Sequence, residues 1–226
     1  MVLKEICIKY SSIAFNYLSD LFFPPVCFYC KSYMQQEKTL CDSCLNHVKP
    51  IVSKKIDITP KYQMRVFAIS DYKDPLRSLI LSKGYSDIVT CRRLGELMWD
   101  MTYVSNVDFD VIVPIPLHWS RFASRGFNQA QEMASVIAKK SSKNVVPVLK
   151  RKKMTKRQSG LTSEKRVANL EDAFSLNVKN GANFKGKHLL IVDDLMTTSS
   201  TLRMAARTLM RLKPASITAV VVCRVV

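Results

Sequence analysis

Short apolar strands that alternate with amphipathic helices constrain the fold of this chain more than any other feature. Two such runs, at residues 109–114 and 188–192, consist mainly of Val, Ile and Leu, and each precedes a helical pattern. Strands that are apolar on both faces are typical of a parallel sheet that is covered by helices on both sides. The sequence therefore predicts an α/β fold with a mainly parallel sheet flanked by helices.

The remaining predicted elements continue this alternation. Further strands are expected at residues 66–70, 145–149 and 217–222. Helices are expected at residues 75–81, 88–102, 128–140 and 200–212. Each predicted helix from residue 88 onward is therefore followed by a strand, as a parallel sheet requires.

We expect three parts along the chain. Residues 1–24 predict an amphipathic helix that ends at two prolines, residues 25–61 a four-cysteine module with a polar linker at 49–61, and residues 62–226 the main domain. The first 23 residues include four charged side chains, which argues against a signal peptide. No uncharged apolar run reaches 18 residues, so we expect a cytoplasmic protein without a membrane span.

The charge of the chain is strongly positive and unevenly distributed. The 226 residues include 35 Lys or Arg and 18 Asp or Glu, a formal net charge of +17. Eleven basic residues and one acidic residue lie between positions 139 and 166. This segment is either a solvated loop or a surface for a phosphate-rich partner. Apolar residues make up 47% of the chain, which excludes a disordered protein.

Four of the seven cysteines form a pattern of metal ligands. Cys27 and Cys30 are separated by two residues, as are Cys41 and Cys44, with ten residues between the pairs. Two such pairs can arrange four thiolates around one Zn²⁺. Because four thiolates fill the coordination shell, the expected zinc is structural. We expect His47 to be a capping or surface histidine. The other three cysteines, Cys7, Cys91 and Cys223, are expected to be ordinary buried thiols.

An acidic pair and a hydroxyl-rich loop follow the strand at 188–192. Asp193 and Asp194 come first, and five hydroxyl residues then precede a helix: Thr197, Thr198, Ser199, Ser200 and Thr201. Ligands of open α/β sheets bind outside the carboxyl ends of the strands, and a helix N-terminus binds anions. Adjacent carboxylates suit the vicinal hydroxyls of a sugar, directly or through Mg²⁺. The combination fits a ribose that carries a 5′-phosphate.

This segment resembles the phosphoribosyl pyrophosphate (PRPP) motif of the type I phosphoribosyltransferases. The resemblance implies that Asp193 and Asp194 contact the ribose hydroxyls and that residues 197–201 hold the 5′-phosphate. The family usually has glycine where Ser199 stands. Because glycine tolerates a positive φ and close ligand approach, this departure bears on the tightness of phosphate binding and not on the fold.

A second segment narrows the resemblance. A strand that ends in Pro-Ile-Pro at residues 114–116 leads into Arg121 and then Arg-Gly-Phe-Asn-Gln at 125–129. Together with the cysteine module and the acidic pair, this order resembles the ComF family of late-competence proteins over essentially the whole chain. The resemblance implies a pyrophosphate-binding loop at 114–118. Arg121 and Arg125 are its candidate pyrophosphate ligands, because arginine offers bidentate geometry to phosphate oxygens.

The basic loop at 150–160 occupies the place of the mobile lid in these folds. Its positive charge can meet pyrophosphate or follow a nucleic-acid backbone. The candidate residues are Lys150, Arg151, Lys152, Lys153, Lys156 and Arg157. A second basic stripe on the last helix, at Arg203, Arg207 and Arg211, is expected to be a solvated face.

Three functions remain open at the sequence level. The first is a PRPP-binding ComF-type protein that acts in DNA uptake and transformation with Mg²⁺, single-stranded DNA and uptake-machinery proteins as partners. The second is an active phosphoribosyltransferase that releases pyrophosphate with an unidentified acceptor. The third is a nucleic-acid binding module on an inactive transferase fold. The sequence assigns no catalytic residue, and we favour the first hypothesis.

Overall fold

The computed structural model describes residues 24–36, 38–81, 87–117, 119–152, 173–177 and 183–225. The chain divides into two compact units, Met1–His47 and Val48–Val226. The helix expected at residues 1–24 lies outside the described residues except for its final proline. Within these ranges, none of the helices combines the length and the apolar character that crossing a membrane requires.

The second unit is built on a six-stranded sheet with the order β1-β2-β8-β7-β3-β4. All neighbouring strands are parallel except β1 and β2, which form an antiparallel hairpin. The strands of this sheet are β1 (Ile51–Thr59), β2 (Tyr62–Asp71), β3 (Val111–Pro114), β4 (Asn144–Val145), β7 (His188–Met196) and β8 (Ser216–Arg224). A separate antiparallel pair contains β5 (Leu149–Arg151) and β6 (Phe174–Leu176). The predicted mainly parallel sheet is confirmed.

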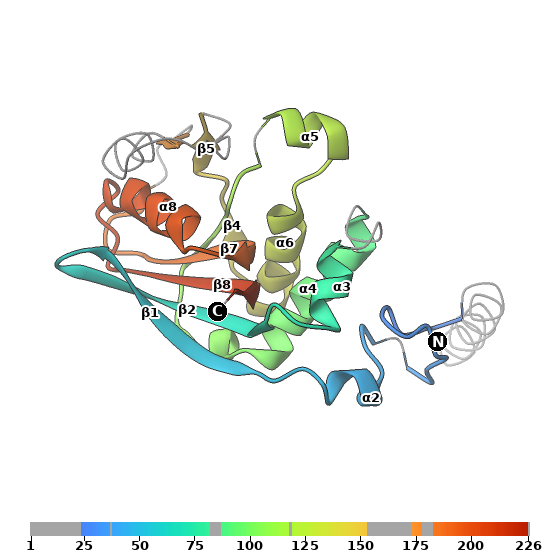
Figure 1. Cartoon of the computed structure of the whole chain (residues 1–226). Helices are drawn as coiled ribbons and strands as arrows, with labels where there is room; N and C mark the ends of the chain where they lie inside the picture. Colours follow the sequence, from blue (N-terminus) through green and yellow to red (C-terminus); the bar gives the residue numbers. More distant parts are fainter. Residues whose placement is uncertain are drawn as a thin grey trace, which may run out of the picture. The chain divides into compact units, whose positions relative to one another are not determined.

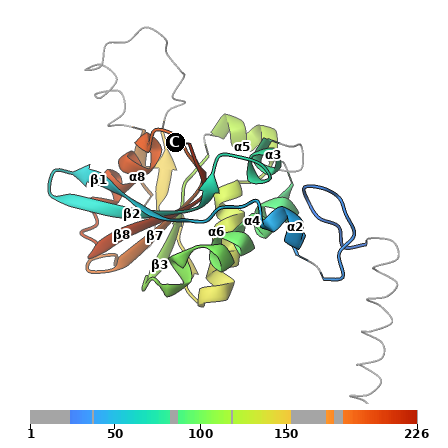
Figure 2. The ribbon, with the colours of Figure 1, turned by 60° about the horizontal axis from the view of Figure 1, so that its bottom comes forward.

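Helices cover both faces of the sheet. Figure 1 shows α8 on one side of the strands and α4 and α6 on the other. Among the described residues of this unit, the helices and the 3-10 turn are α3 (Leu76–Leu81), α4 (Ile88–Met101), η2 (Tyr103–Asn106), α5 (Trp119–Arg125), α6 (Gln129–Ser141) and α8 (Ser200–Met210). Strands β7, β8 and β2 run beside one another in the rotated view of Figure 2, as their pairing requires.

Strand alternation explains the two halves of the core. Ile191 and Val221 pack in one buried cluster with Leu202 and Ala205 of α8. Successive side chains of a strand point to opposite faces, so Leu190 of β7 faces away from α8. Leu190 is 0% exposed, which shows that the second face is covered as completely as the first.

Residues 49–61 are not a linker, because most of them form β1. Ile56 and Ile58 are buried, and the intervening Asp57 is exposed, which is the alternation of a half-buried strand. Lys54 and Lys55 are exposed in the same strand, and their charge conceals the pattern in the sequence. The compact second unit therefore begins at Val48 and not at residue 62.

Two other predicted strands have different limits in the structure. The strand expected at 145–149 is divided into β4 and β5, with Pro147 between them. Proline has no backbone N–H to donate to a sheet, which accounts for the break. The strand expected at 188–192 continues to Met196 and therefore contains both aspartates of the acidic pair.

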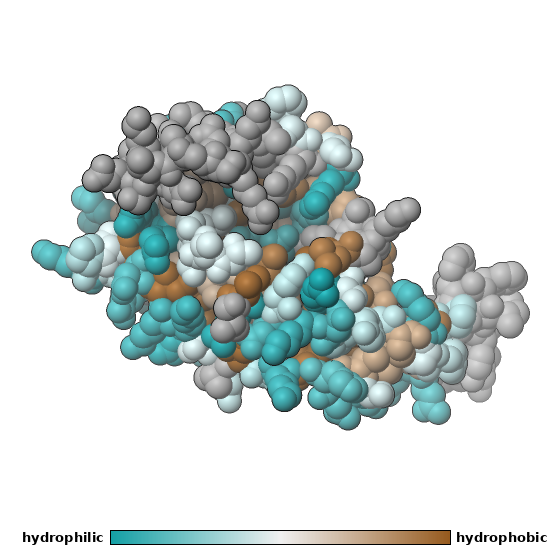
Figure 3. Space-filling model, in the orientation of Figure 1, coloured by the Kyte–Doolittle hydropathy of each residue, from teal (hydrophilic) through white to brown (hydrophobic). Residues whose placement is uncertain are grey.

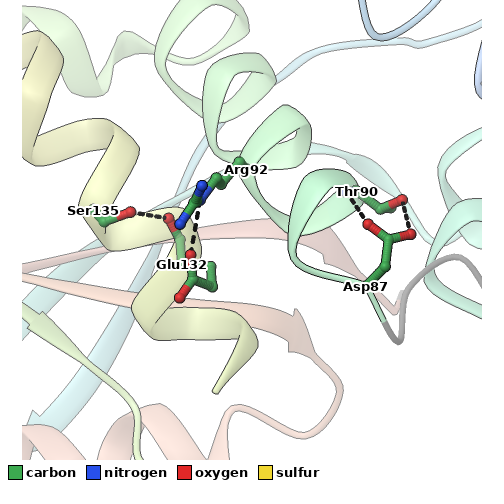
Figure 4. Close-up of polar contacts among 5 residues, drawn as sticks. All are labelled: Asp87, Thr90, Arg92, Glu132 and Ser135. Atoms are coloured by element: carbon green, nitrogen blue, oxygen red, sulfur yellow. Dashed lines mark hydrogen bonds and ion pairs between the residues drawn. The ribbon is translucent and has the colours of Figure 1, made fainter. Parts of the chain in front are cut away.

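Helices α4 and α6 pack closely against each other. A Cβ atom on Gly95 of α4 would lie 2.9 Å from the Met133 carbonyl oxygen of α6, so glycine permits this approach. Arg92 Nε donates to Glu132 Oε2 at 2.9 Å across the same pair of helices (Figure 4). The Asp87 carboxylate caps α4 by accepting from the backbone N–H of Thr90 at 2.8 Å (Figure 4). These contacts fix the position of α6, whose first turn adjoins the candidate site.

Candidate functional site

The four cysteines of the first unit lie together in the geometry of a zinc site. The sulfur atoms of Cys27, Cys30, Cys41 and Cys44 all lie within 4.8 Å of one another. The Sγ atoms of Cys30 and Cys41 are 3.6 Å apart. Four Zn–S bonds of ~2.3 Å in a tetrahedron place sulfur atoms about 3.8 Å apart. The donor set and its spacing therefore fit one four-coordinate structural zinc ion.

Backbone hydrogen bonds shape the first cysteine pair. The N–H of Lys31 donates to the Cys27 carbonyl at 3.0 Å, and the N–H of Cys27 donates to the Ser32 carbonyl at 2.9 Å. Lys31 itself has a φ of 63°, which closes this tight turn. The turn brings both sulfur atoms of the pair to one side without a disulfide.

The second cysteine pair belongs to the short helix α2 (Asp42–Leu45) and its N-cap. Cys41 is its N-cap and Cys44 lies in its only turn. His47 is exposed, and its Nδ1 lies 2.8 Å from the Ser43 carbonyl oxygen. His47 is therefore an exposed residue at the end of α2, as expected from the sequence.

The environment favours the thiolate form at Cys30. A hydrogen bond with the Ser32 hydroxyl, 3.0 Å from the sulfur, lowers the pKa of Cys30 to about 6. Burial instead raises the pKa of Cys44. A bound cation removes the protons of all four thiols, because only thiolates ligate zinc.

In the second unit, the acidic pair lies where β7 extends beyond β3. The pairing of these strands ends at Pro114 and Val192, whereas β7 remains paired with β8 as far as Met196. Asp193 is 8% exposed and Asp194 is half-buried. They are successive residues of the strand, and their carboxyl groups lie close enough to interact with each other. The pair therefore stands at the carboxyl edge of the sheet, beside the loop that follows β3.

Asp193 has an unusual electrostatic environment. Burial, and then the charge of Asp194, raise the pKa of Asp193 well above its usual value. The positive charge of Arg151 acts in the opposite direction. The half-buried guanidinium of Arg151 lies 5.6 Å from the Phe174 ring centroid, which connects the start of the basic segment to β6.

The hydroxyl loop leads directly into the N-terminus of α8. Thr197 and Thr198 are exposed, and Thr198 Oγ1 lies 2.8 Å from Ser200 Oγ. Ser199 is the N-cap of α8, but its side chain does not cap the backbone of the first turn. The N–H groups of such a turn are available to an anion, which the helix dipole also attracts.

Ser199 adopts the left-handed conformation, with φ 59° and ψ 0°. This is the conformation for which glycine carries no steric cost, and it explains why glycine is usual at this position in the family that the sequence resembles. In this chain Ser199 adopts the same left-handed turn conformation although it is not glycine. The serine at this position therefore introduces local backbone strain at the edge of the hydroxyl-rich loop.

The loop after β3 is connected to both neighbouring elements. The N–H of Ile115 donates to the Val192 carbonyl of β7 at 2.9 Å. Asn128 Nδ2 donates to the Ile115 carbonyl at 3.0 Å, while its Oδ1 caps the N–H of Ala130 at 3.1 Å. Asn128 thus caps α6 and also connects the loop to this helix.

Of the two candidate pyrophosphate ligands, Arg125 is exposed at the end of α5. Arg121 belongs to the same helix, but its side chain lies outside the described part, as does His118. The helix α5 was not predicted from the sequence. The structure brings the loop after β3, the acidic pair and the α8 N-terminus to one edge of the sheet.

The basic segment is described only at its beginning. Lys150 and Arg151 belong to β5, and Lys152 follows it. Lys150 and Lys152 are exposed. The other lid candidates, Lys153, Lys156 and Arg157, lie outside the described residues.

The stripe on α8 is not simply a solvated face, as the sequence led us to expect. Arg203 Nε donates to the Asp57 carbonyl at 2.9 Å, and Arg207 Nε donates to the Ile58 carbonyl at 2.7 Å. Both arginines therefore hold the tip of the β1–β2 hairpin against α8. Sequence analysis could not find this role because β1 itself was not predicted.

The remaining cysteines behave as expected. Cys91 and Cys223 are both 0% exposed. Burial raises the pKa of each thiol to about 12. They are inert core residues, and Cys7 lies outside the described residues.

Comparisons with known protein families agree with this geometry. The family described as "Phosphoribosyl transferase domain" matches residues 102–225, and the family described as "Double zinc ribbon domain" matches residues 18–56. The fold and the site thus define a type I phosphoribosyltransferase domain with an N-terminal zinc ribbon.

Three relatives identify the family more closely. Competence protein F of Haemophilus influenzae is 30% identical over 195 residues, which cover 83% of this chain and 80% of that protein. DNA utilization protein YhgH of Escherichia coli K12 is 27% identical over 218 residues, with 88% and 90% covered. Competence protein ComFC of Bacillus subtilis is 33% identical over 100 residues, with 44% and 38% covered. The chain belongs to the ComF family.

Proposed function

We propose that this protein binds PRPP and supports DNA uptake and natural transformation through single-stranded DNA. The observation that carries the proposal is the convergence of three features at the carboxyl edge of β3 and β7. These are the acidic pair, the uncapped first turn of α8 and the loop that Asn128 holds. The printed names of the relatives, competence protein F and DNA utilization protein, support the biological role.

Each part of the site has a proposed ligand group. Asp193 and Asp194 would hold the ribose hydroxyls and a Mg²⁺ ion, because carboxylate oxygens are hard ligands that suit this cation. The hydroxyls of residues 197–201 and the N–H groups of α8 would hold the 5′-phosphate. Arg121 and Arg125 would neutralise the pyrophosphate.

An active phosphoribosyltransferase is the second candidate. The family match at residues 102–225 favours it, because that range includes both the loop after β3 and the acidic strand. Such a reaction would depend on position and charge: fixed cations stabilise the leaving pyrophosphate while positive charge develops on the sugar. Ser199, where glycine is usual, instead favours the third hypothesis of an inactive transferase fold that binds nucleic acid.

The basic segment is the proposed contact to DNA phosphates, starting from Lys150, Arg151 and Lys152. Uptake-machinery proteins are proposed further partners. We place this function in the cytoplasm, where thiols stay reduced and can ligate zinc.

Two measurements on the purified protein separate the three hypotheses. Fluorescence anisotropy of a labelled single-stranded oligonucleotide, with and without PRPP and Mg²⁺, tests DNA binding and its response to the ligand. Pyrophosphate release with a panel of bases and amines tests transfer. We expect DNA binding that PRPP changes and no pyrophosphate release. Release with any acceptor would support the enzyme, and DNA binding without a PRPP response would support the inactive fold.

A further inference from the structure

The described side chains of helix α5 lie outside the buried core. None of its described side chains is buried, and it has only seven residues. Burial in the core therefore does not explain the residues that it carries. It nevertheless carries two large aromatic side chains.

These two aromatic residues are exposed on neighbouring positions of one helix face. Trp119 is 73% exposed and Phe122 is 50% exposed. They are three residues apart, which places them on the same side of the helix, about 4.5 Å apart along its axis. Pale and light-brown surface lies over part of α5 in the space-filling view (Figure 3). Large exposed apolar groups of this kind mark interaction sites.

The charge around the aromatic pair selects the partner. Between residues 111 and 131 the sequence contains Arg121 and Arg125 and no Asp or Glu. Arg125, at the end of α5, is exposed. Aromatic side chains beside cations suit a ligand that has flat bases and a polyanionic backbone. An apolar protein partner would not offer negative charges that complement these arginines.

We propose that Trp119 and Phe122 form a stacking platform for the bases of single-stranded DNA, on a stretch of the chain that has basic and no acidic side chains. The inference rests on the proposed function, and it assigns to α5 the base contacts that the aromatic-poor basic segment does not supply. The helix α5 comes directly after the loop that follows β3 in the chain, so bound DNA would lie beside the proposed PRPP site.

The test compares oligonucleotides with and without bases. Wild type and Trp119→Ala/Phe122→Ala are titrated with oligo-dT and with an abasic oligonucleotide of equal length at several salt concentrations. We expect the double variant to lose at least about tenfold in affinity for oligo-dT while its affinity for the abasic strand stays unchanged. The salt slope should be the same in both proteins, because phosphate contacts are kept.

Two controls make the result specific. Tyr103→Ala removes another exposed aromatic, 59% exposed in η2 before β3, and should leave oligo-dT affinity unchanged. Trp119→Phe should keep most of the affinity. Trp99 and Trp119 are the two tryptophans of the chain. In a Trp99→Phe background, the fluorescence of Trp119 should therefore be quenched by oligo-dT and not by the abasic strand. Because α5 buries no described side chain, the Trp119 and Phe122 variants should keep the thermal midpoint of their parent protein.

Failure of this inference differs from failure of the proposed function. If wild type binds neither oligonucleotide, DNA handling itself is wrong. If wild type binds oligo-dT and the abasic strand equally, or if the double variant binds oligo-dT like wild type, the stacking platform is wrong while DNA handling stands. A double variant that loses affinity for both strands would equally contradict base stacking.

Discussion

At the scale of single residues, the site combines two groups that are held at a cost to the fold. Ser199 has a positive φ, and Asp193 is a carboxyl group buried next to a second carboxylate. Strained conformations and perturbed pKa values are typical of functional positions. Both costs occur at the edge where the ligand is proposed to bind.

Ser199→Gly should stabilise the protein by about 1 kcal/mol, because glycine removes the steric cost of the left-handed conformation. Ser200→Gly is the matched control. Ser200 is the first residue of α8, so glycine there should lower the stability. Urea denaturation of the three proteins measures the difference. A loss of stability in both variants would contradict the conformation assigned to Ser199.

Asp193→Asn should make the ligand-free protein more stable at neutral pH. The pKa of Asp193 is raised in the folded state, so its favourable contribution is fully present below the unfolded pKa of about 3.9 and is lost as pH rises through the raised value. The asparagine variant avoids this loss. The stability difference should therefore disappear below about pH 4. Denaturation curves at several pH values test this, and a pH-independent difference would contradict it.

At the scale of elements, the packing of α6 against α4 determines where Asn128 and the loop after β3 lie. Asn128 is held at the start of α6, and α6 is held against α4 through Gly95 and the Arg92–Glu132 ion pair. The ion pair is largely exposed on the arginine side, so close packing accounts for more of the stability than charge does.

Gly95→Ala should destabilise the second unit by about 1–3 kcal/mol, because the new methyl group meets the α6 backbone at Met133. Val89→Ala changes an exposed residue of the same helix and should cost less than about 0.5 kcal/mol. Chemical denaturation provides the comparison. Equal stability of the two variants would show that the helices can separate without cost.

The limits of the sequence predictions also belong to the scale of elements. The buried strands β3 and β7 and the Asn128 cap were predictable because apolar runs and caps are local signals. β1 was not predicted, because Lys54 and Lys55 conceal its alternation and its stability depends on pairing with β2. The extension of β7 through Asp193 was not predictable either, since continued pairing with β8 is a non-local cause. The helix α5 was not predicted either, because its seven residues carry no local helix signal that we recognised in the sequence.

At the scale of the whole molecule, two units with different sources of stability are joined in one chain. The second unit has a large buried core, whereas the first has four cysteines around a metal site. Small modules of this kind depend on zinc for folding. The net charge of +17 favours polyanions in general, so only base-dependent binding is informative about DNA.

Zinc removal should therefore unfold the first unit selectively. Purified protein should contain one zinc per chain, and a chelator should release it and expose residues 24–47 to protease. The unit from Val48 should keep its unfolding transition. Elemental analysis, limited proteolysis and circular dichroism provide the readouts. Purified protein without stoichiometric zinc, or a ribbon that resists protease after chelation, would contradict the metal assignment.

The central claim is that the edge formed by β3, β7 and α8 binds PRPP. Calorimetric titration of PRPP with Mg²⁺ tests it most directly, using wild type and the Asp193→Asn/Asp194→Asn variant side by side. We predict binding by wild type and its loss in a double variant that remains folded. No binding by wild type, or equal affinity in the double variant, would contradict the account.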